Sequence, residues 1–524
     1  MHTRAALASA TLLAATLTVL SVGPAQAATT RYEAEASPTV CTGTVDSDWT
    51  GFSGTGFCNG TNATGAHAQF TVTAAAAGTA TLKIRFANGT TTARPADLAV
   101  NGTTTASVSF EGTGTWTGWT TKTLTVPVRS GSNTIRFTPT TAAGLPNLDY
   151  LDVDTATTTP PTADALYVAP GGTDGAAGTQ SAPTTLTSAI ARITPGGTIY
   201  LRGGTYNHTQ GVTVPAGNNG TASARTTLSA YPGETPVLNF SAMTEDPANR
   251  GLTVNGNYWH VYGITVERAG DNGIYVGGSN NVIERTVTRY NRDSGLQLGR
   301  ISSTTPAAQW PSNNLVLSAE SHDNADSDGE DADGFAAKLT VGPGNVFRYA
   351  VSHNNIDDGW DLYTKTDTGP IGPVTIEDSL SYNNGTLSNG TVNANGDRNG
   401  YKLGGDDIAV NHTVRRSIAY HNGKHGFTWN SNPGTMAVSS NLSIDNAQRN
   451  YSWDAGTSVF RSNTSCRFTV SGSNDKTIGD ADTTNQFWTG TNGSRCAPYS
   501  GALAWSFASD GHLAVTIGGK AVTL

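Results

Sequence analysis

The second half of the chain contains four aspartates whose spacing suits a cation site, and one lysine that could accept a proton beside it. They are Asp333, Asp357, Asp358, Asp361 and Lys402. Carboxylates that lie close together cannot all stay ionised without a counter-charge, and Ca²⁺ accepts several such oxygens at about 2.3–2.6 Å. Bound Ca²⁺ would lower the pKa of a nearby lysine and acidify the proton next to a substrate carboxylate. We therefore predict a Ca²⁺-assisted β-elimination on a uronic-acid polymer, with Lys402 as the base.

Two other interpretations of these residues stay open. Asp-Gly pairs are also common turns, and a surface salt bridge between Lys402 and Asp361 would contribute little. The chain would then be a noncatalytic glycan-binding protein. A glycoside hydrolase needs two carboxyl groups about 5–9.5 Å apart, one of them protonated. We expect the aspartates to cluster more tightly than that, which disfavours hydrolysis.

An internal repeat must position these residues. Glycines that begin a Gly-apolar-x-apolar segment are 22, 39, 25, 41 and 26 residues apart. A second motif alternates with the first and ends in Asn291, Asn324, Asn355, Asn384, Asn422 and Asn446. Such units are too short for the roughly 40-residue blade of a propeller. The pattern is typical of a stacked solenoid and predicts an all-β, right-handed parallel β-helix with an asparagine ladder.

The repeat also predicts which side chains share a face. Strand side chains alternate, so the middle residue of each first motif faces outward, in the column Tyr275, Gln297, Ala336, Asp361, Lys402 and Thr428. The residue before each glycine forms a second column of Asn272, Ser294, Asp333, Asp358, Asn399 and His425. We expect Asp333 to stack on Asp358 and Asp361 to lie beneath Lys402. A bend at Gly359 is needed to bring Asp358 and Asp361 together.

The composition is typical of an all-β exported protein. The 524 residues have a net charge of −9, and charged residues make up 14 %, against about 25 % in an average soluble protein. This excludes a nucleic-acid-binding protein with a basic face. The 61 glycines argue against a coiled coil. Hydrophobic residues, at 36 %, are sufficient for a packed core.

Residues 1–27 have the features of a cleaved signal peptide, which predicts a secreted, extracellular protein. An apolar run from Ala5 to Val22 is followed by the small-x-small site Ala25-Gln26-Ala27. Thr and Ser residues interrupt the run, which disfavours a membrane anchor. No later run reaches the roughly 18 apolar residues of a membrane span.

Four cysteines in an exported chain predict disulfide bonds. Three pairings are possible, and local closure favours Cys41–Cys58 and Cys466–Cys496. Neither pair has CxxC or histidine-rich surroundings, so structural zinc is not expected.

A Thr/Pro-rich segment divides the mature chain into two domains. We place a linker at residues 155–165, a β-sandwich (jelly-roll) domain at 28–154 and the β-helix at 166–524. The smaller part contains short alternating strands separated by Asn-Gly turns.

The smaller domain resembles carbohydrate-binding modules of families 6 and 35. The resemblance rests on the opening Tyr32-Glu33-Ala34-Glu35 and the closing segment 147–154. It implies a structural calcium held by Glu33, Glu35 and Asp154. It also implies a sugar site in the loops at one end, with Asn147 and either Trp116 or Trp119 as candidates. Core packing is the alternative role for the two tryptophans.

Three blocks of the larger domain resemble the signature blocks of family 9 pectate lyases. They are residues 332–338, 357–363 and 399–405, and the opening segments 167–172 and 204–206 add to the resemblance, which spans about 166–470. The resemblance implies that the four aspartates hold a catalytic Ca²⁺ and that Lys402 is the base. We add Lys338 and Arg398 as candidates for binding uronate carboxylates; both could equally be surface cations.

Together these observations predict a secreted, monomeric, two-domain polysaccharide lyase. We expect it to cleave the α-1,4-galacturonate backbone of pectate to 4,5-unsaturated products, while the N-terminal module binds plant cell-wall glycan. A rhamnogalacturonan lyase is a close alternative, since the same elimination works on galacturonate that alternates with rhamnose. A noncatalytic wall-binding protein and a β-helix hydrolase are the alternatives from other classes.

Overall fold

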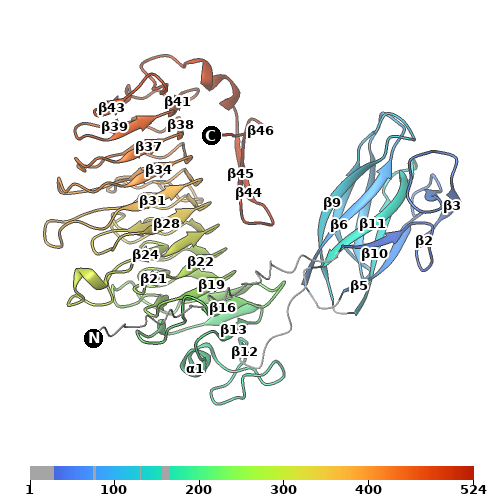
Figure 1. The fold of residues 1–524 in the computed structure, drawn as a ribbon, viewed down its shortest axis with the longest axis horizontal. Helices are drawn as coiled ribbons and strands as arrows, with labels where there is room; N and C mark the ends of the chain where they lie inside the picture. Colours follow the sequence, from blue (N-terminus) through green and yellow to red (C-terminus); the bar gives the residue numbers. More distant parts are fainter. Residues whose placement is uncertain (1–28, 75–77, 130, 156–164) are drawn as a thin grey trace, which may run out of the picture. The chain divides into compact units, whose positions relative to one another are not determined.

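The computed structural model describes residues 29–74, 78–129, 131–155 and 165–524 (Figure 1). The predicted signal peptide and nearly all of the predicted linker lie outside these ranges. The chain divides into two compact units, Met1–Thr159 and Pro160–Leu524, and each is considered by itself. Within the described ranges, none of the helices is long and apolar enough to cross a lipid bilayer.

The described part of the first unit is a sandwich of two antiparallel sheets. One has the order β3-β4-β11-β6-β9 with β1 beside β11, and the other has the order β2-β5-β10-β7-β8. The strands are β1 (Thr29–Glu33), β2 (Val40–Cys41), β3 (Gly43–Asp46), β4 (Phe57–Gly60), β5 (Ala68–Ala74), β6 (Gly78–Ala87), β7 (Arg94–Val100), β8 (Thr103–Phe110), β9 (Thr120–Val128), β10 (Gly131–Pro139) and β11 (Asn147–Thr155).

The sandwich core forms because alternate residues of each strand point inward. Phe70, Ile84, Phe137 and Leu151 are fully buried between the two sheets. A disulfide between Cys41 in β2 and Cys58 in β4 joins the sheets. The predicted β-sandwich is therefore confirmed.

The second unit is a right-handed parallel β-helix, as predicted. Three parallel sheets run along residues 165–481, and each coil, or rung, contributes one short strand to each sheet. The first sheet contains β12 (Ala165–Val168), β13 (Thr198–Leu201), β16 (Thr226–Ala230), β19 (Trp259–Tyr262), β22 (Val282–Glu284), β25 (Leu315–Leu317), β28 (Asn345–Arg348), β31 (Val374–Glu377), β34 (Thr413–Arg415), β37 (Ala437–Ser439), β40 (Val459–Arg461) and β43 (Asp480–Ala481).

The other two sheets follow the same stacking order. The second sheet contains β14 (Gly204–Asn207), β17 (Pro236–Asn239), β20 (Thr265–Glu267), β23 (Val287–Arg289), β26 (Glu320–His322), β29 (Val351–His353), β32 (Leu380–Tyr382), β35 (Ile418–Tyr420), β38 (Leu442–Ile444) and β41 (Thr464–Cys466). The third sheet contains β15 (Val212–Val214), β18 (Leu252–Val254), β21 (Ile274–Val276), β24 (Leu296–Leu298), β27 (Phe335–Ala337), β30 (Trp360–Asp361), β33 (Tyr401–Lys402), β36 (Phe427–Thr428), β39 (Tyr451–Trp453) and β42 (Lys476–Thr477).

Buried ladders hold successive rungs in register. The predicted asparagine ladder is confirmed: each Nδ2 donates to the Oδ1 of the next asparagine at 2.8–3.0 Å, from Asn291 through Asn446. Behind the third sheet, inward-facing rings stack in the order Trp360, Tyr401, Phe427 and Tyr451. The asparagine ladder gives hydrogen-bond partners to buried amide groups that would otherwise destabilise the core. The ring stack buries large aromatic side chains against one another.

The ends of the β-helix are covered by other elements. Helix α1 (Leu186–Arg192) is capped by the Thr185 hydroxyl, which accepts from the Ser188 N–H, and it buries Leu186 and Ile190 at the N-terminal end.

The short helix η1 (Ala307–Gln309) lies in the 39-residue repeat unit.

The last forty residues leave the coil. After helix η2 (Ser494–Tyr499), the strands β44 (Leu503–Phe507), β45 (Leu513–Ile517) and β46 (Lys520–Ala521) form an antiparallel sheet that lies alongside the rungs (Figure 1). Val515 and Ile517 pack on Val351, Leu380 and other apolar residues of the second sheet.

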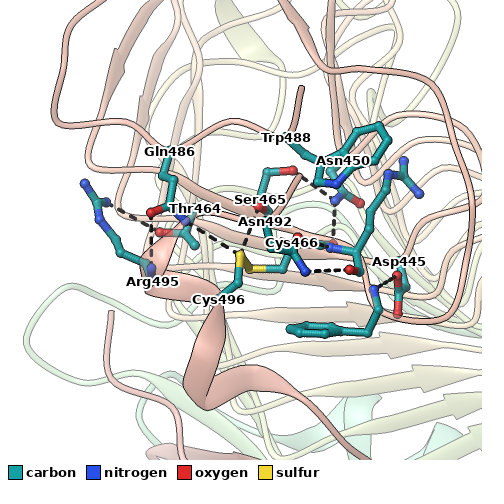
Figure 2. The surroundings of a disulfide bond; sticks show 12 residues. Asp445, Asn450, Thr464, Ser465, Cys466, Gln486, Trp488, Asn492, Arg495 and Cys496 are labelled. Carbon is teal, nitrogen blue, oxygen red and sulfur yellow. Dashed lines mark hydrogen bonds between the residues drawn. A yellow bond between two sulfur atoms is a disulfide. The ribbon is translucent and has the colours of Figure 1, made fainter. Parts of the chain in front are cut away.

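The disulfide Cys466–Cys496 connects this C-terminal segment to the second sheet (Figure 2). Cys466 ends strand β41 and Cys496 lies in η2, and both are buried. Around them the Asn492 Nδ2 donates to the Arg467 carbonyl at 2.6 Å, and the Gln486 Oε1 accepts from the Arg495 N–H at 3.1 Å. Both disulfides have the local pairing that the sequence favoured.

Candidate active site

The third sheet assembles the outward column that the repeat predicted. Its strands pair so that Gln297 lies beside Ala336, Ala336 beside Asp361, Asp361 beside Lys402 and Lys402 beside Thr428. The prediction that Asp361 lies next to Lys402 on the adjacent rung is therefore confirmed.

The column before the glycines is also in register. The Gly334 N–H donates to the Asp358 carbonyl, and the Gly359 N–H donates to the Asn399 carbonyl. The Asp358 N–H donates to the Asp333 Oδ1 at 3.3 Å. Asp333 and Asp358 thus stack on adjacent rungs, as predicted.

Asp358 and Asp361 face the same side of the coil. Their Oδ2 atoms lie 3.4 Å and 3.7 Å from the Lys402 Nζ. An ideal strand would point residues three apart in opposite directions, so the chain turns between them. The turn occurs at Gly359, where a Cβ would lie 2.1 Å from the Ser381 Oγ, and only glycine fits this contact.

Three of the predicted ligands form one buried acidic group. Asp333, Asp357 and Asp358 each place a carboxylate oxygen within 4.8 Å of the other two. Backbone donors fix the carboxylates: the Asp397 N–H donates to the Asp357 Oδ1 and the Asn399 N–H donates to the Asp358 Oδ1, both at 2.5 Å. These contacts hold the carboxylates in place while leaving other oxygens free for a ligand.

The fourth predicted ligand, Asp361, lies at the edge of this group. Its Oδ1 accepts from the Tyr363 N–H at 2.9 Å, and its Oδ2 lies 3.5 Å from the Lys338 Nζ. It therefore stands between two lysine ammonium groups beside the other three aspartates.

The acidic group has the electrostatics of a cation site. Burial raises the pKa of the Asp333 carboxyl to about 7, against the opposing effect of Lys338. Burial and then mutual repulsion raise the pKa values of Asp357 and Asp358 well above their usual range. The Asp358 Oδ2 is buried and accepts no hydrogen bond from the described residues. Clustered carboxylate oxygens, one of them buried with an ion-pair contact to Lys402 but no hydrogen bond, fit a hard cation such as Ca²⁺.

Lys402 is bound on three sides by carboxylates. Burial lowers the pKa of its ammonium, but Asp361, Asp358, Asp357 and Asp397 outweigh burial, so the pKa lies well above its usual value. Its Nζ is 3.2 Å from the Asp397 Oδ2. Lys402 therefore carries a proton unless some of this negative charge is offset.

Lys338 is not the surface cation that we considered as one alternative, and its binding of a substrate carboxylate stays a prediction. It is buried, with its Nζ 2.8 Å from the Asp333 Oδ2 and 3.5 Å from the Asp361 Oδ2. It follows β27 directly and points into the acidic group, where it balances part of its charge. A second carboxylate would have to displace these contacts.

The role of Arg398 in substrate binding stays a prediction. Its backbone has a left-handed φ of 59°. The side chain packs against Gly385 and Gly423, so close that a Cβ on either glycine would lie within 3 Å of it. Only the backbone N–H of Arg398 contacts the site, where it donates to the Asp357 Oδ1 at 3.1 Å.

Sequence reasoning missed two charged residues of the site, Asp397 and Lys424. Asp397 lies between Lys402, at 3.2 Å, and Lys424, at 2.5 Å. Neither residue belongs to a repeated column. The only signal was the 41-residue spacing before Gly400, because an inserted loop brings Asp397 back to the coil.

The first unit contains a second acidic group. The Ser53 Oγ donates to the Glu33 Oε1, the Thr55 N–H donates to the Glu35 Oε1 and the Ser53 N–H donates to the Asp149 Oδ1, all at 2.8–2.9 Å. The Oε2 atoms of both glutamates are buried and unpartnered among the described residues. These donors fit a hard cation.

Asp154 does not belong to this group, which corrects our expectation. In the antiparallel register of β1 and β11, Glu33 pairs with Tyr150, whereas Asp154 pairs with Thr29 at the far end of β1. Asp154 instead bonds Lys83 at 2.8 Å. The closing carboxylate near the glutamates is Asp149, since a bulge in β11 between Leu148 and Leu151 turns it inward.

The three candidate sugar-binding residues lie near strand ends. Asn147 begins β11 and is buried beside Ala87. Trp116 is half-buried over Gly89, and Trp119 is half-buried against Phe57, with ring centroids 5.4 Å apart. Packing explains part of the position of each tryptophan, and each keeps an exposed portion.

Comparisons with known proteins agree with this geometry. Residues 166–464 match the family described as "Pel9A-like, right handed beta helix region". Pectate lyase L of Paenibacillus polymyxa (strain SC2) is 54 % identical over 325 residues, which are 62 % of this chain and 72 % of that protein. The crystal structure of pectate lyase Pel9A is 33 % identical, with a TM-score of 0.55, over 63 % of this chain and 81 % of that chain.

The first unit has its own relatives. Residues 67–153 match the family described as "Alpha-galactosidase, CBM13 domain". A family 35 carbohydrate-binding module from Cellvibrio japonicus Abf62 is 41 % identical over 25 % of this chain and 95 % of that module, with a TM-score of 0.24. The match over residues 166–464 and the relatives named pectate lyase show that the chain belongs to the family 9 pectate lyases, a group of polysaccharide lyases, and residues 67–153 match a family of carbohydrate-binding modules.

Proposed function

We propose that this protein is a secreted, Ca²⁺-dependent pectate lyase that cleaves α-1,4-linked galacturonate by β-elimination. One observation carries the proposal: an amine, Lys402, faces the same outward surface as a buried group of carboxylates. The relatives named pectate lyase share this part of the chain. Secretion is supported by the signal-peptide features of residues 1–27.

Asp333, Asp357, Asp358 and Asp361 would hold the Ca²⁺. When bound, the ion offsets the charge of these carboxylates, lowers the pKa of Lys402 and draws electron density from a substrate carboxylate. The backbone donors of Asp397 and Asn399 keep the carboxylates in position before any ligand arrives.

Neutral Lys402 then acts as the general base on the galacturonate C5. Its amine takes the C5 proton, and the C5–H electron pair forms the C4=C5 double bond. The C4–O bond breaks, and the glycosidic oxygen leaves with the other sugar chain and takes a proton from water. Asp397, 3.2 Å from the Nζ, holds the resulting ammonium in place.

Product analysis on polygalacturonate tests the proposal. With Ca²⁺, the protein should release oligosaccharides that absorb ultraviolet light and are one water lighter than hydrolysis products; a chelator should stop the release. Saturated products would indicate a hydrolase, and no products would indicate a binding protein. A parallel incubation with rhamnogalacturonan shows which of the two polymers is the better substrate. If the protein cleaves rhamnogalacturonan faster, that polymer takes the place of pectate in the proposal.

A further inference from the structure

A polar pocket lies on the rungs that follow Lys402. Its volume is about 240 Å³, and its lining includes Lys424, His425, Thr428, Trp429 and Arg449. We propose that this pocket binds the free carboxylate of the galacturonate unit next to the one that loses its proton, with Arg449 as the main contact. The inference rests on the proposed function and assigns a specificity-determining residue to it.

The floor of the pocket continues the column of the catalytic lysine. Lys402 pairs with Thr428 and Thr428 pairs with Ser452 in the third sheet. After the long side chain of Lys402, the column has the short hydroxyl side chains of Thr428 and Ser452. These short side chains leave a hollow directly beside Lys402. Hydroxyl groups on a pocket floor are suitable partners for sugar hydroxyls.

The lining of the pocket combines an aromatic ring with cations. Trp429 is half-buried and packs on the β-helix core. The lining also includes Lys424 and Arg449, whose side chains are about one third exposed. An aromatic ring and cations in one pocket suit a sugar ring that carries a carboxylate.

The cations around this pocket outnumber their carboxylate partners. Lys424 pairs with Asp397, and Asp454 is shared by Arg449, at 3.8 Å, and Lys476, at 2.6 Å. Three cations therefore share two carboxylates, and Asp397 also pairs with Lys402, which has Asp358 and Asp361 as further partners. The excess positive charge would be balanced by a carboxylate from the substrate.

Arg449 is positioned to meet this carboxylate. Its backbone N–H donates to the His425 Nδ1 at 3.2 Å, its Nε donates to the Asn474 carbonyl at 3.2 Å, and its Nη1 donates to the Ser452 Oγ at 3.4 Å. These contacts hold the guanidinium over the pocket floor, and its one carboxylate partner, Asp454, lies at the longer distance of 3.8 Å. A guanidinium can bind a carboxylate with two parallel hydrogen bonds.

The rungs before the acidic group have the opposite charge. A pocket there is lined by seven acidic side chains, including Asp271, Asp293 and Asp331, and by one arginine, Arg292. A polyanionic chain is repelled by this surface and attracted by the surface beyond Lys402. The charge gradient thus places the required free carboxylate on the later rungs.

The test measures binding in the Lys402→Ala background, which does not turn over the substrate. Calorimetry with tetragalacturonate in Ca²⁺ buffer compares this parent with a second variant that also carries Arg449→Gln. Loss of a charge-assisted contact should weaken binding about 10- to 100-fold. Arg461→Gln is the matched control: Arg461 lies in β40 of the first sheet, on the next rung, and pairs with Asp480 and Asp482.

Two further measurements make the result specific. Arg449→Lys keeps the charge but loses the two-point contact, so it should recover part of the affinity that Arg449→Gln loses, which would not be expected if Arg449 only supported the fold. Fully methyl-esterified tetragalacturonate should bind the parent and the Arg449→Gln variant equally.

The proposal is overturned if Arg449→Gln changes affinity by about twofold or less, or if Arg461→Gln weakens binding as much. The two proposals can fail separately. If the unmutated protein forms no unsaturated product but the Arg449 effect is present, only the lyase function is wrong.

Discussion

Asp361 and Lys402 are register partners on adjacent rungs of the third sheet, and the Asp361 Oδ2 lies 3.7 Å from the Lys402 Nζ. The backbone hydrogen bonds of the sheet fix this relationship, because residues that pair in a parallel ladder keep a constant separation. The base and one proposed ligand of the cation are therefore held by the coil itself and need no loop movement to meet.

Replacement of Lys402 by alanine should abolish most of the activity. A general base contributes about 10²- to 10⁴-fold to a rate, so we expect kcat on polygalacturonate to fall by that factor while the circular dichroism spectrum is unchanged. Lys365→Ala changes an exposed lysine and should retain activity. A Lys402→Ala protein with normal kcat would remove this residue from the mechanism.

Asp358 should determine how strongly Ca²⁺ stabilises the β-helix. A ligand at 100 times its Kd stabilises the folded state by about 2.7 kcal/mol, and Asp358→Asn should lose most of this effect in thermal unfolding with and without Ca²⁺. The physical reason is that Asp358 belongs to the buried acidic group and that its Oδ2 accepts no hydrogen bond from the described residues. Asp378→Asn affects a carboxylate that pairs with Arg416 and should leave the Ca²⁺ effect intact. Equal Ca²⁺ stabilisation in Asp358→Asn would exclude Asp358 as a ligand.

In the carbohydrate-binding module, Asp149 and Asp154 should behave differently. A chelator should lower the unfolding temperature of the module, and Asp149→Asn should remove this sensitivity because Asp149 lies with Glu33 and Glu35. Asp154→Asn should keep it, since Asp154 pairs with Lys83. Calorimetric unfolding of the full chain with and without Ca²⁺ measures both. If Asp154→Asn removed the chelator sensitivity and Asp149→Asn kept it, Asp154 would be the calcium ligand and our correction would be wrong.

His412 should make the β-helix less stable in mild acid. Burial lowers the pKa of this fully buried imidazole to about 3, whereas an unfolded histidine titrates near 6.5. The unfolded state binds more protons between these pH values, so the free energy of unfolding should fall as the pH falls, by about 2 kcal/mol from pH 7 to 5.

His412→Asn should flatten this pH dependence while keeping an acceptor for the Val374 N–H. Urea unfolding at pH 7 and 5 measures the difference, and the exposed His512, changed to Asn, serves as the control. An unchanged slope in His412→Asn would show that other groups cause the acid sensitivity.

The sequence predicted the parts of this protein that repeat. A glycine directly precedes each of the third-sheet strands from β21 to β36, and an asparagine lies two residues after each of the second-sheet strands from β23 to β38. These markers fix the register from one rung to the next, because the strands are short and parallel. The stacking of Asp333 on Asp358, the pairing of Asp361 with Lys402 and the asparagine ladder all followed from this register.

Residues outside the repeat could not be placed in this way. Asp397 comes from an inserted loop, Lys338 turns inward after its strand ends, and the Arg398 side chain packs against Gly385 and Gly423. A second set of stacked asparagines, Asn441, Asn463 and Asn485, lies at turns whose spacing differs from the first motif. The bulge in β11 similarly decides that Asp149, and not Asp154, joins Glu33.

The amino-acid sequence by itself determined the coil, its register and therefore the neighbours of Lys402, since a parallel ladder transmits position through backbone hydrogen bonds. Tertiary structure alone decided which charged side chains turn toward that lysine and where the C-terminal strands cover the second sheet. Turns, bulges and inserted loops set those directions, and their backbone angles depend on packing against distant rungs.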